Sequence, residues 1–325
     1  MKTLVTGATG FLGGHLVETL VARGDTVLAL ARRPETHAAL AVLGATPVPG
    51  SLEDDHSLSD ALRGVDVVYH AAGLTAARDE AEFFAVNEGG TRRLIGAIRT
   101  AAPGLQRLVY ISSQAALGPS PRGQRLGEDA ECRPITSYGR SKLGGEVAVR
   151  ESGLPWTVLR PSAVYGPADR EFLRLFQIVR RGIAPVFGTG DQELSLVFVR
   201  DLVQLIALAG THPAMADQVV HAAHGEVVLS RDVARAAGAA IGRTPIIVPL
   251  PGFIAAPIVG LIGRAAAAAG RRSVVNADKM AEFLAPSWLL SVEKAGQLVN
   301  WRAGTDVASG MRATAAWYRE HQWLR

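Results

Sequence analysis

The chain has 325 residues, of which 48% are hydrophobic and 20% are charged. This globular composition excludes disordered and collagen-like proteins. Its 34 Lys and Arg against 30 Asp and Glu leave a net charge of +4, spread along the chain, so we expect no nucleic-acid partner. The single cysteine, Cys132, excludes a disulfide within one chain and disfavours a thiolate metal site. Because the first residues lead directly into a glycine motif, we expect no signal peptide and a cytoplasmic location.

Short apolar segments alternate with helical patterns in the first half of the chain. Segments rich in Val, Ile and Leu, with little polar alternation, occupy residues 3–6, 26–31, 65–70, 108–112 and 157–159. This pattern is typical of strands buried on both faces. Between the first two segments Leu12, Leu16 and Leu20 recur every four residues and Gly24 follows, which predicts an amphipathic helix with a glycine cap. The repetition predicts an α/β fold with a doubly wound parallel sheet, the Rossmann architecture.

The second half is less regular. Glycine and proline punctuate residues 166–190, which we expect to cover the open edge of a substrate cleft. The apolar pattern of residues 194–199 predicts another strand, and we expect a helix to begin at Arg200 and Asp201. We therefore assign the chain to two domains. Residues 1–165 and a return segment at about 194–224 form the dinucleotide-binding domain, and residues 166–193 and 225–325 form a smaller C-terminal substrate-binding domain.

Residues 246–262 are markedly apolar. Pro249, Pro251 and Pro257 interrupt them, and the uninterrupted part is too short to span a bilayer. A membrane-surface helix is one alternative. We favour a helix packed in the smaller domain or lining an apolar pocket.

A glycine motif marks the first strand-to-helix turn, where residues 6–13 are TGATGFLG. Gly7 permits a tight turn, Gly10 lets the backbone approach a diphosphate, and Gly13 lets the helix pack on the strand. Free backbone N–H groups and the helix dipole favour negative charge at the helix start. The motif predicts a dinucleotide site that includes Gly7, Thr9, Gly10, Phe11, Leu12 and Gly13.

The end of the second strand bears on the type of coenzyme. Ala31 stands where an NAD-binding site usually carries an acidic residue for the ribose 2′-hydroxyl. Arg32 and Arg33 follow, and a guanidinium can pair with a 2′-phosphate through two charged hydrogen bonds. This predicts NADP(H), with NAD(H) as the alternative. In the competing interpretation the two arginines only form a solvated loop.

Tyr138 and Lys142 are four residues apart, which places them on one face of a helix. Free tyrosine, with a pKa near 10, is a poor acid or base at neutral pH, and a nearby ammonium would lower that pKa. Tyr138 is therefore our candidate general acid/base. Ser112 and Ser113 end the fifth predicted strand, where a hydroxyl can stabilise developing negative charge or simply cap the strand end. His221 and His224 lack an accompanying carboxylate cluster, so we expect no metal site.

Together these residues resemble the extended short-chain dehydrogenase/reductase family, also called the NAD-dependent epimerase/dehydratase family, over nearly the whole chain. Residues 6–13 are similar to its TGxxGxxG signature, and residues 160–167 (RPSAVYGP) to its nicotinamide-contacting turn. The resemblance implies catalytic roles for Ser113, Tyr138, Lys142 and Asn87. It also implies coenzyme contacts at Ser51 (where the family has Asp), Leu52, Ala71, Ala72, Gly73, Ser112, Tyr138, Lys142, Pro161 and Val164.

Three local features distinguish the branches of this family. Gln114 follows Ser113 where nucleotide-sugar dehydratases usually carry an acid, and Ala163 stands where many nucleotide-sugar epimerases carry Asn. Residues 112–119 are similar to the 3β-hydroxysteroid dehydrogenase and dihydroflavonol reductase branches. We therefore expect an NADP(H)-dependent oxidoreductase acting on a secondary alcohol or ketone of a small, fairly apolar substrate. The alternatives are a nucleotide-sugar epimerase with tightly bound NAD and a catalytically silent coenzyme-binding protein. The resemblance also implies a homodimer, built by the helix that bears Tyr138 and the helix after Asn87.

Overall fold

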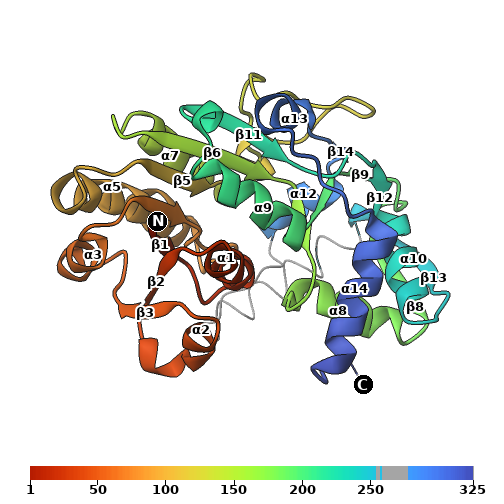
Figure 1. The fold of residues 1–325 in the computed structure, drawn as a ribbon. Helices are drawn as coiled ribbons and strands as arrows, with labels where there is room; N and C mark the ends of the chain where they lie inside the picture. Colours follow the sequence, from red (N-terminus) through yellow and green to blue (C-terminus); the bar gives the residue numbers. More distant parts are fainter. Residues whose placement is uncertain (254–256, 258–276, 325) are drawn as a thin grey trace.

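A seven-stranded parallel sheet forms the centre of the computed structural model, which describes residues 1–253, 257 and 277–324 (Figure 1). Its strand order is β11-β6-β5-β4-β1-β2-β3. After β3 the chain crosses back to the other side of β1, so the order reverses between β1 and β4. Such a switch point opens a ligand crevice at the carboxyl ends of the strands. The strands are β1 (Lys2–Thr6), β2 (Thr26–Ala31), β3 (Thr46–Pro49), β4 (Val67–His70), β5 (Arg107–Ile111), β6 (Trp156–Pro161) and β11 (Gln218–Ala222).

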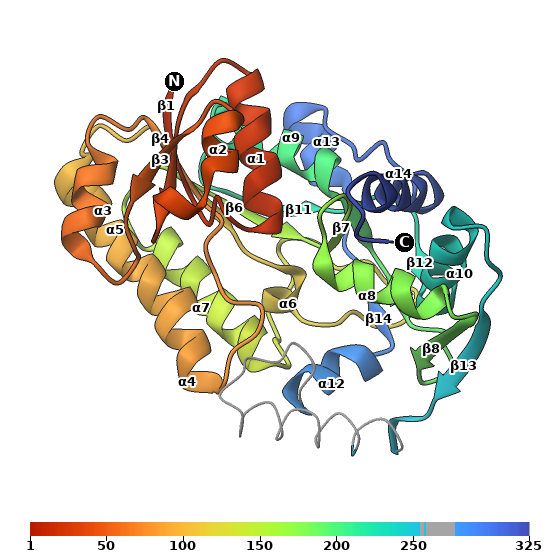
Figure 2. The same ribbon diagram turned by 90° about the horizontal axis from the view of Figure 1, so that it is seen from below.

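Helices cover both faces of this sheet (Figures 1 and 2). One face packs against α1 (Phe11–Ala22) and α9 (Val199–Ala209). The other packs against α3 (Asp55–Leu62), α5 (Gly90–Ala101) and α7 (Ser137–Arg150). Successive residues of a strand point to opposite faces, and Leu4 and Val5 are accordingly buried in the two separate cores. Burial on both sides explains the unbroken apolar segments, and the predicted Rossmann architecture is confirmed.

The first predicted helix is also confirmed. Leu16 and Leu20 of α1 are fully buried. Gly24 follows the helix with φ +91°, a left-handed conformation that glycine adopts without strain. The shorter helical elements of the first half are η1 (Pro34–Thr36), α2 (Ala38–Val42), α4 (Glu80–Phe83), the π-helix η2 (Phe84–Gly89) and α6 (Gln114–Leu117).

The C-terminal part pairs short strands with helices beside the carboxyl edge of the main sheet (Figure 2). Tyr165, Phe176, Met311 and Tyr318 are buried in its own core. The strands are β7 (Ala163–Tyr165), β8 (Ile183–Phe187), β9 (Glu193–Leu194), β10 (Leu196–Phe198), β12 (Val228–Leu229), β13 (Ile246–Leu250) and β14 (Ser287–Trp288). The helices are α8 (Arg170–Val179), η3 (Pro213–Met215), α10 (Ser230–Ala240), α12 (Ala277–Leu284), α13 (Glu293–Val299) and α14 (Val307–Glu320).

Two expectations for this part need correction. The single strand expected at residues 194–199 is split into β9 and β10 at the buried Ser195, whose N–H and hydroxyl both bond the backbone at residues 288–290. Val199 already belongs to α9.

The helix expected at the start of residues 246–262 is wrong, because residues 246–250 form β13 beside β8. Ile246, Ile247 and Val248 favour a strand. Among the strands that the structure describes, this one pairs with β8 alone, so the missing N–H of Pro249 is tolerated. Residues 254–256 and 258–262 lie outside the described part of the chain. Among the helices that are described, none combines the length and the hydropathy needed to cross a membrane.

A buried ion pair ties α7 to the ends of two central strands. Glu146 of α7 and Arg160 of β6 are 0% and 2% exposed, and Arg160 Nη2 lies 2.7 Å from Glu146 Oε2. Ser112, just after β5, donates its hydroxyl hydrogen to Glu146 Oε1 at 2.5 Å. Because Tyr138 and Lys142 lie on the same helix, this network fixes α7 against the strand end that carries Ser113.

Replacing Glu146 by Gln should lower the free energy of unfolding by about 3 kcal/mol, because it leaves a buried guanidinium without a counter-charge. Denaturant unfolding monitored by circular dichroism measures this change. The matched control is Glu131→Gln, whose pair with Arg133 has the same 2.7 Å separation but lies exposed on the surface. Equal losses for both variants would contradict a stabilising role of the buried pair.

Candidate functional site

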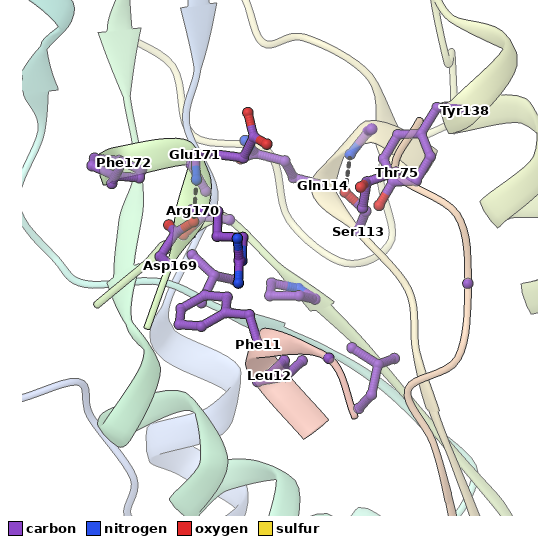
Figure 3. Close-up of a pocket in the computed structure, with 18 of the residues that line it drawn as sticks. Phe11, Leu12, Thr75, Ser113, Gln114, Tyr138, Asp169, Arg170, Glu171 and Phe172 are labelled. Atoms are coloured by element: carbon purple, nitrogen blue, oxygen red, sulfur yellow. Dashed lines mark hydrogen bonds between the residues drawn. The ribbon is translucent and has the colours of Figure 1, made fainter. Parts of the chain in front are cut away.

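A cavity of about 1200 Å³ lies beyond the carboxyl ends of the central strands. The glycine turn and the start of α1 line one end, Ser113 and Tyr138 line its side, and α8 and α12 contribute from the C-terminal part. Figure 3 shows Ser113 and Tyr138 together across from Arg170 and Phe172, with Phe11 at the base. A site between the strand ends and a second set of elements is typical of ligand binding in open α/β folds.

The glycine turn has the geometry of a diphosphate cradle. Gly7 has φ +72°, and a Cβ there would lie 2.7 Å from the Ala72 nitrogen. A Cβ on Gly13 would overlap the Gly7 carbonyl, so packing within the protein alone requires glycine at both positions. Gly10 differs, because its Cβ would meet only the Gly7 oxygen, at 3.3 Å. Packing therefore does not require glycine there, whereas close approach of a ligand to the backbone does.

The start of α1 supports the same fit. No side chain caps the helix at Gly10, and unpaired N–H groups at a helix N-terminus attract anions. The residues of this end of the cavity thus suit the diphosphate of a dinucleotide. Of the predicted coenzyme residues, the cavity is lined by Gly7, Thr9, Gly10, Phe11, Leu12, Gly13, Ala71, Gly73, Ser112, Tyr138, Lys142, Pro161 and Val164.

Five other predicted coenzyme residues are not among those lining this cavity. Arg32 and Arg33 are exposed beyond the end of β2. Ser51 and Leu52 follow β3, where the Ser51 hydroxyl accepts a hydrogen bond from the Glu53 N–H at 3.2 Å. Ala72 donates its N–H to Thr6 Oγ1 at 3.2 Å. Contacts of all five residues with a coenzyme stay predictions.

The environment of the phenol differs from our expectation. Burial is the largest effect and raises the pKa of Tyr138 to about 12, a rise opposed by hydrogen bonding with Ser113 and reinforced by the Glu282 carboxylate. The expected lowering by Lys142 is therefore wrong for this structure. The lysine amine donates instead to the Ile111 carbonyl at 2.6 Å and lies 4.4 Å from the Tyr110 ring centre.

Burial has the opposite effect on the lysine. It lowers the pKa of Lys142 to about 8, although the Glu146 carboxylate one turn further along α7 favours the charged form.

Ser113 serves two purposes. Its Oγ caps α6 by accepting the Ala115 N–H at 3.1 Å, and the same residue lines the cavity.

Asn87 acts behind the cavity wall. It is 1% exposed in the π-helix η2. Its Oδ1 accepts the Leu74 N–H at 2.7 Å, and its Nδ2 donates to the Leu74 carbonyl at 3.1 Å and to Ser141 Oγ at 2.9 Å. Because Leu74 lines the cavity and Asn87 does not, the structure makes Asn87 a positioning residue that joins the loop after β4 to α7.

The sequence did not reveal the cavity residues contributed by α12. Lys279 and Glu282 form an ion pair there and line the cavity near Tyr138. Lys279 is one of only four lysines in a chain that otherwise uses arginine, and this was the single available signal. Nothing in the local sequence indicates that this helix packs over the start of α7.

Comparison with known proteins places this geometry in a family. The model of the NAD dependent epimerase/dehydratase family matches residues 3–223. A ceramide reductase from Caulobacter vibrioides is 31% identical over 98% of this chain and 95% of its own. A 2-alkyl-3-oxoalkanoate reductase from Stenotrophomonas maltophilia is 31% identical over 74% of this chain and 76% of its own. The solved structure of MoeE5 in complex with UDP-glucose and NAD has a TM-score of 0.80 at 25% identity, covering 99% of this chain and 100% of that one.

The match covers the glycine turn, Ser113, Tyr138 and Lys142, and the reductase relatives span most of the chain. This chain belongs to the NAD-dependent epimerase/dehydratase family and is an NAD(P)-dependent oxidoreductase of the extended short-chain dehydrogenase/reductase type.

Proposed function

We propose that the protein is an NADP(H)-dependent reductase that interconverts a ketone and a secondary alcohol on a fairly apolar substrate. The observation that carries this proposal is one continuous cavity with a diphosphate cradle at one end, Ser113 and Tyr138 at its side and apolar side chains beyond them. When bound, the coenzyme supplies the hydride that the reduction needs.

The protein groups suit the proton side of that reaction. Burial raises the pKa of Tyr138 to about 12, which makes the phenol a weaker acid than free tyrosine but keeps it in the protonated form that a reduction needs. From its place in the cavity wall it can give that proton to a carbonyl oxygen as hydride reaches the carbonyl carbon. The Ser113 hydroxyl can donate a hydrogen bond to the same oxygen and stabilise its developing charge. A charged Lys142 attracts the anionic coenzyme.

The proposed substrate class rests on the wall of the cavity and on the relatives. Beyond Tyr138 the wall includes Phe172, Leu175, Phe187, Phe283 and Trp288, which favour an apolar ligand. Two of the reductases similar to this chain are named for ceramide and for 2-alkyl-3-oxoalkanoates.

A nucleotide-sugar epimerase with tightly bound NAD is the second candidate, because the similar MoeE5 structure holds UDP-glucose and NAD. Ala163, which lines the cavity, lacks the amide that many such epimerases carry at the matching position. Purified protein that retains NAD and isomerises UDP-glucose without net redox would favour this candidate over the first.

Three further assignments belong to this proposal. The domain boundary near residue 165 and the cytoplasmic location stay predictions. So does the homodimer through α5 and α7, which light scattering can test.

Tyr138→Phe should lower kcat by about 100-fold or more, because it removes the proton that the carbonyl oxygen receives. Steady-state NADPH consumption with a panel of long-chain ketones measures kcat, and fluorescence titration should show little change in coenzyme affinity. Tyr69→Phe is the matched control, since that phenol bonds the Ala207 carbonyl away from the cavity. Normal turnover by Tyr138→Phe would remove its proposed role.

Replacing Arg32 and Arg33 together by Ser should weaken NADPH binding by about 10-fold or more and leave NADH binding nearly unchanged, because charged hydrogen bonds to the 2′-phosphate are lost. Dissociation constants for both coenzymes measure the change in preference. Arg243→Ser controls for the loss of an exposed positive charge elsewhere. Parallel losses for both coenzymes would instead assign these arginines a general electrostatic role.

Activity should decline as the pH rises through about 8. Lysine is charged below its pKa, and burial lowers the pKa of Lys142 to about 8, so its attraction for the anionic coenzyme weakens above that pH. We expect kcat/KM for NADPH, which reports groups of the free enzyme, to show this decline. Lys142→Arg should move the decline to much higher pH, because a guanidinium stays protonated. An unchanged profile in that variant would exclude Lys142 as the titrating group.

A further inference from the structure

Helix α12 brings an acid and its counter-ion over the phenol. Thr136 donates its hydroxyl hydrogen to Glu282 Oε1 at 2.8 Å. The other carboxylate oxygen pairs with the Lys279 amine, which lies 5.2 Å from the centre of the Tyr138 ring. Lys279 and Glu282 both line the cavity, so a charged carboxylate faces the space next to the group that protonates the substrate.

Apolar side chains, together with the amide of Gln192, lie beside this pair in the cavity wall. Its cavity neighbours include Val186, Phe187, Phe283 and Trp288. The Glu282 side chain is only 11% exposed, and removing a carboxylate from water lowers stability even when it is paired. Fully apolar residues would line a purely apolar substrate site at less cost, so the position of this carboxylate points to a role in recognition.

Anchoring of α12 does not account for the carboxylate. The backbone carbonyl of Glu282 already accepts hydrogen bonds from the Gln192 side chain at 2.8 Å and the Trp288 ring at 3.0 Å. Thr136 is held independently as the N-cap of α7, where its Oγ1 accepts the Gly139 N–H at 3.1 Å. The helix is thus fastened by groups other than the Glu282 side chain.

The carboxylate retains acceptor capacity. An ionised carboxylate offers about four lone-pair positions, and Thr136 and Lys279 occupy two of those on Glu282. A ligand group that completes this set must donate hydrogen. Because Lys279 neutralises the acid, a neutral donor such as a hydroxyl or an amide N–H suits the position better than an ammonium, while Glu282 repels a carboxylate.

We propose that Glu282 accepts a hydrogen bond from a hydroxyl or amide N–H of the substrate close to its reacting carbonyl. The substrates are then amphiphilic ketones, with an apolar chain in the aromatic part of the cavity and a neutral donor beside the carbonyl. This inference rests on the proposed reductase function and specifies its substrate class.

Two ketone probes separate the inference from the function on which it rests. One is a long-chain 1-hydroxy-2-ketone and the other is the 2-ketone of the same chain length without the hydroxyl. Wild-type protein with NADPH should prefer the hydroxyketone in kcat/KM by about 10-fold or more, as expected for a hydrogen bond to a charged group. The ratio of the two values cancels any effect of Glu282 on the pKa of Tyr138, because both ketones receive the same proton.

Glu282→Leu should reduce this preference to about one, and Glu282→Gln, which keeps a weaker acceptor, should give an intermediate ratio. Glu293→Leu on α13, an exposed acid outside the cavity, should keep the wild-type ratio. If Glu282→Leu does not fold, the kcat/KM ratio of Glu282→Gln for the two ketones tests the proposal. No turnover of either probe by the wild type would count against the proposed function. Turnover of both without preference, or a preference that survives in both Glu282 variants, would overturn the role of Glu282.

Discussion

The contact between the start of α1 and the end of β1 is the constraint on which this site depends. Gly13 lies so close to the Gly7 carbonyl that any side chain would collide with it. This closeness fixes the direction of α1, and with it the direction of the unpaired N–H groups at its N-terminus, which point to the carboxyl edge of the sheet. Gly10 is the one glycine of the three at which a Cβ would meet only a single backbone atom, the Gly7 oxygen at 3.3 Å, so the protein's own packing demands glycine least at this position.

Burial sets the proton chemistry around that edge. The same loss of solvent raises the pKa of Tyr138 and lowers the pKa of Lys142, because low polarity disfavours the charged form of either group. The Tyr138 phenol and the Lys142 amine do not shift each other's pKa through a direct contact, because the amine bonds the Ile111 carbonyl instead. The helix that carries both is held in turn by Glu146 and Arg160 in the core.

Recognition and chemistry come from different parts of the chain. The N-terminal strands and α1 supply the glycine turn of the cavity, and α7 and the end of β5 supply Tyr138, Lys142 and Ser113. The C-terminal helices α8 and α12 supply apolar side chains together with the charged Arg170, Glu171, Lys279 and Glu282.

The sequence by itself determined the parallel sheet, the first helix and the residues of the glycine turn, because these depend on local periodicity and on glycine at fixed spacing. It also predicted roles for Ser113, Tyr138 and Lys142, which the structure brings to one cavity. Tertiary structure alone decided the strand at residues 246–250, the positioning role of Asn87 and the high pKa of Tyr138. Only the tertiary structure places Glu282, which is 144 residues beyond Tyr138 in the chain, next to the Tyr138 phenol. Packing between distant segments sets burial and neighbouring charges, and no local pattern in the sequence encodes which segments will meet.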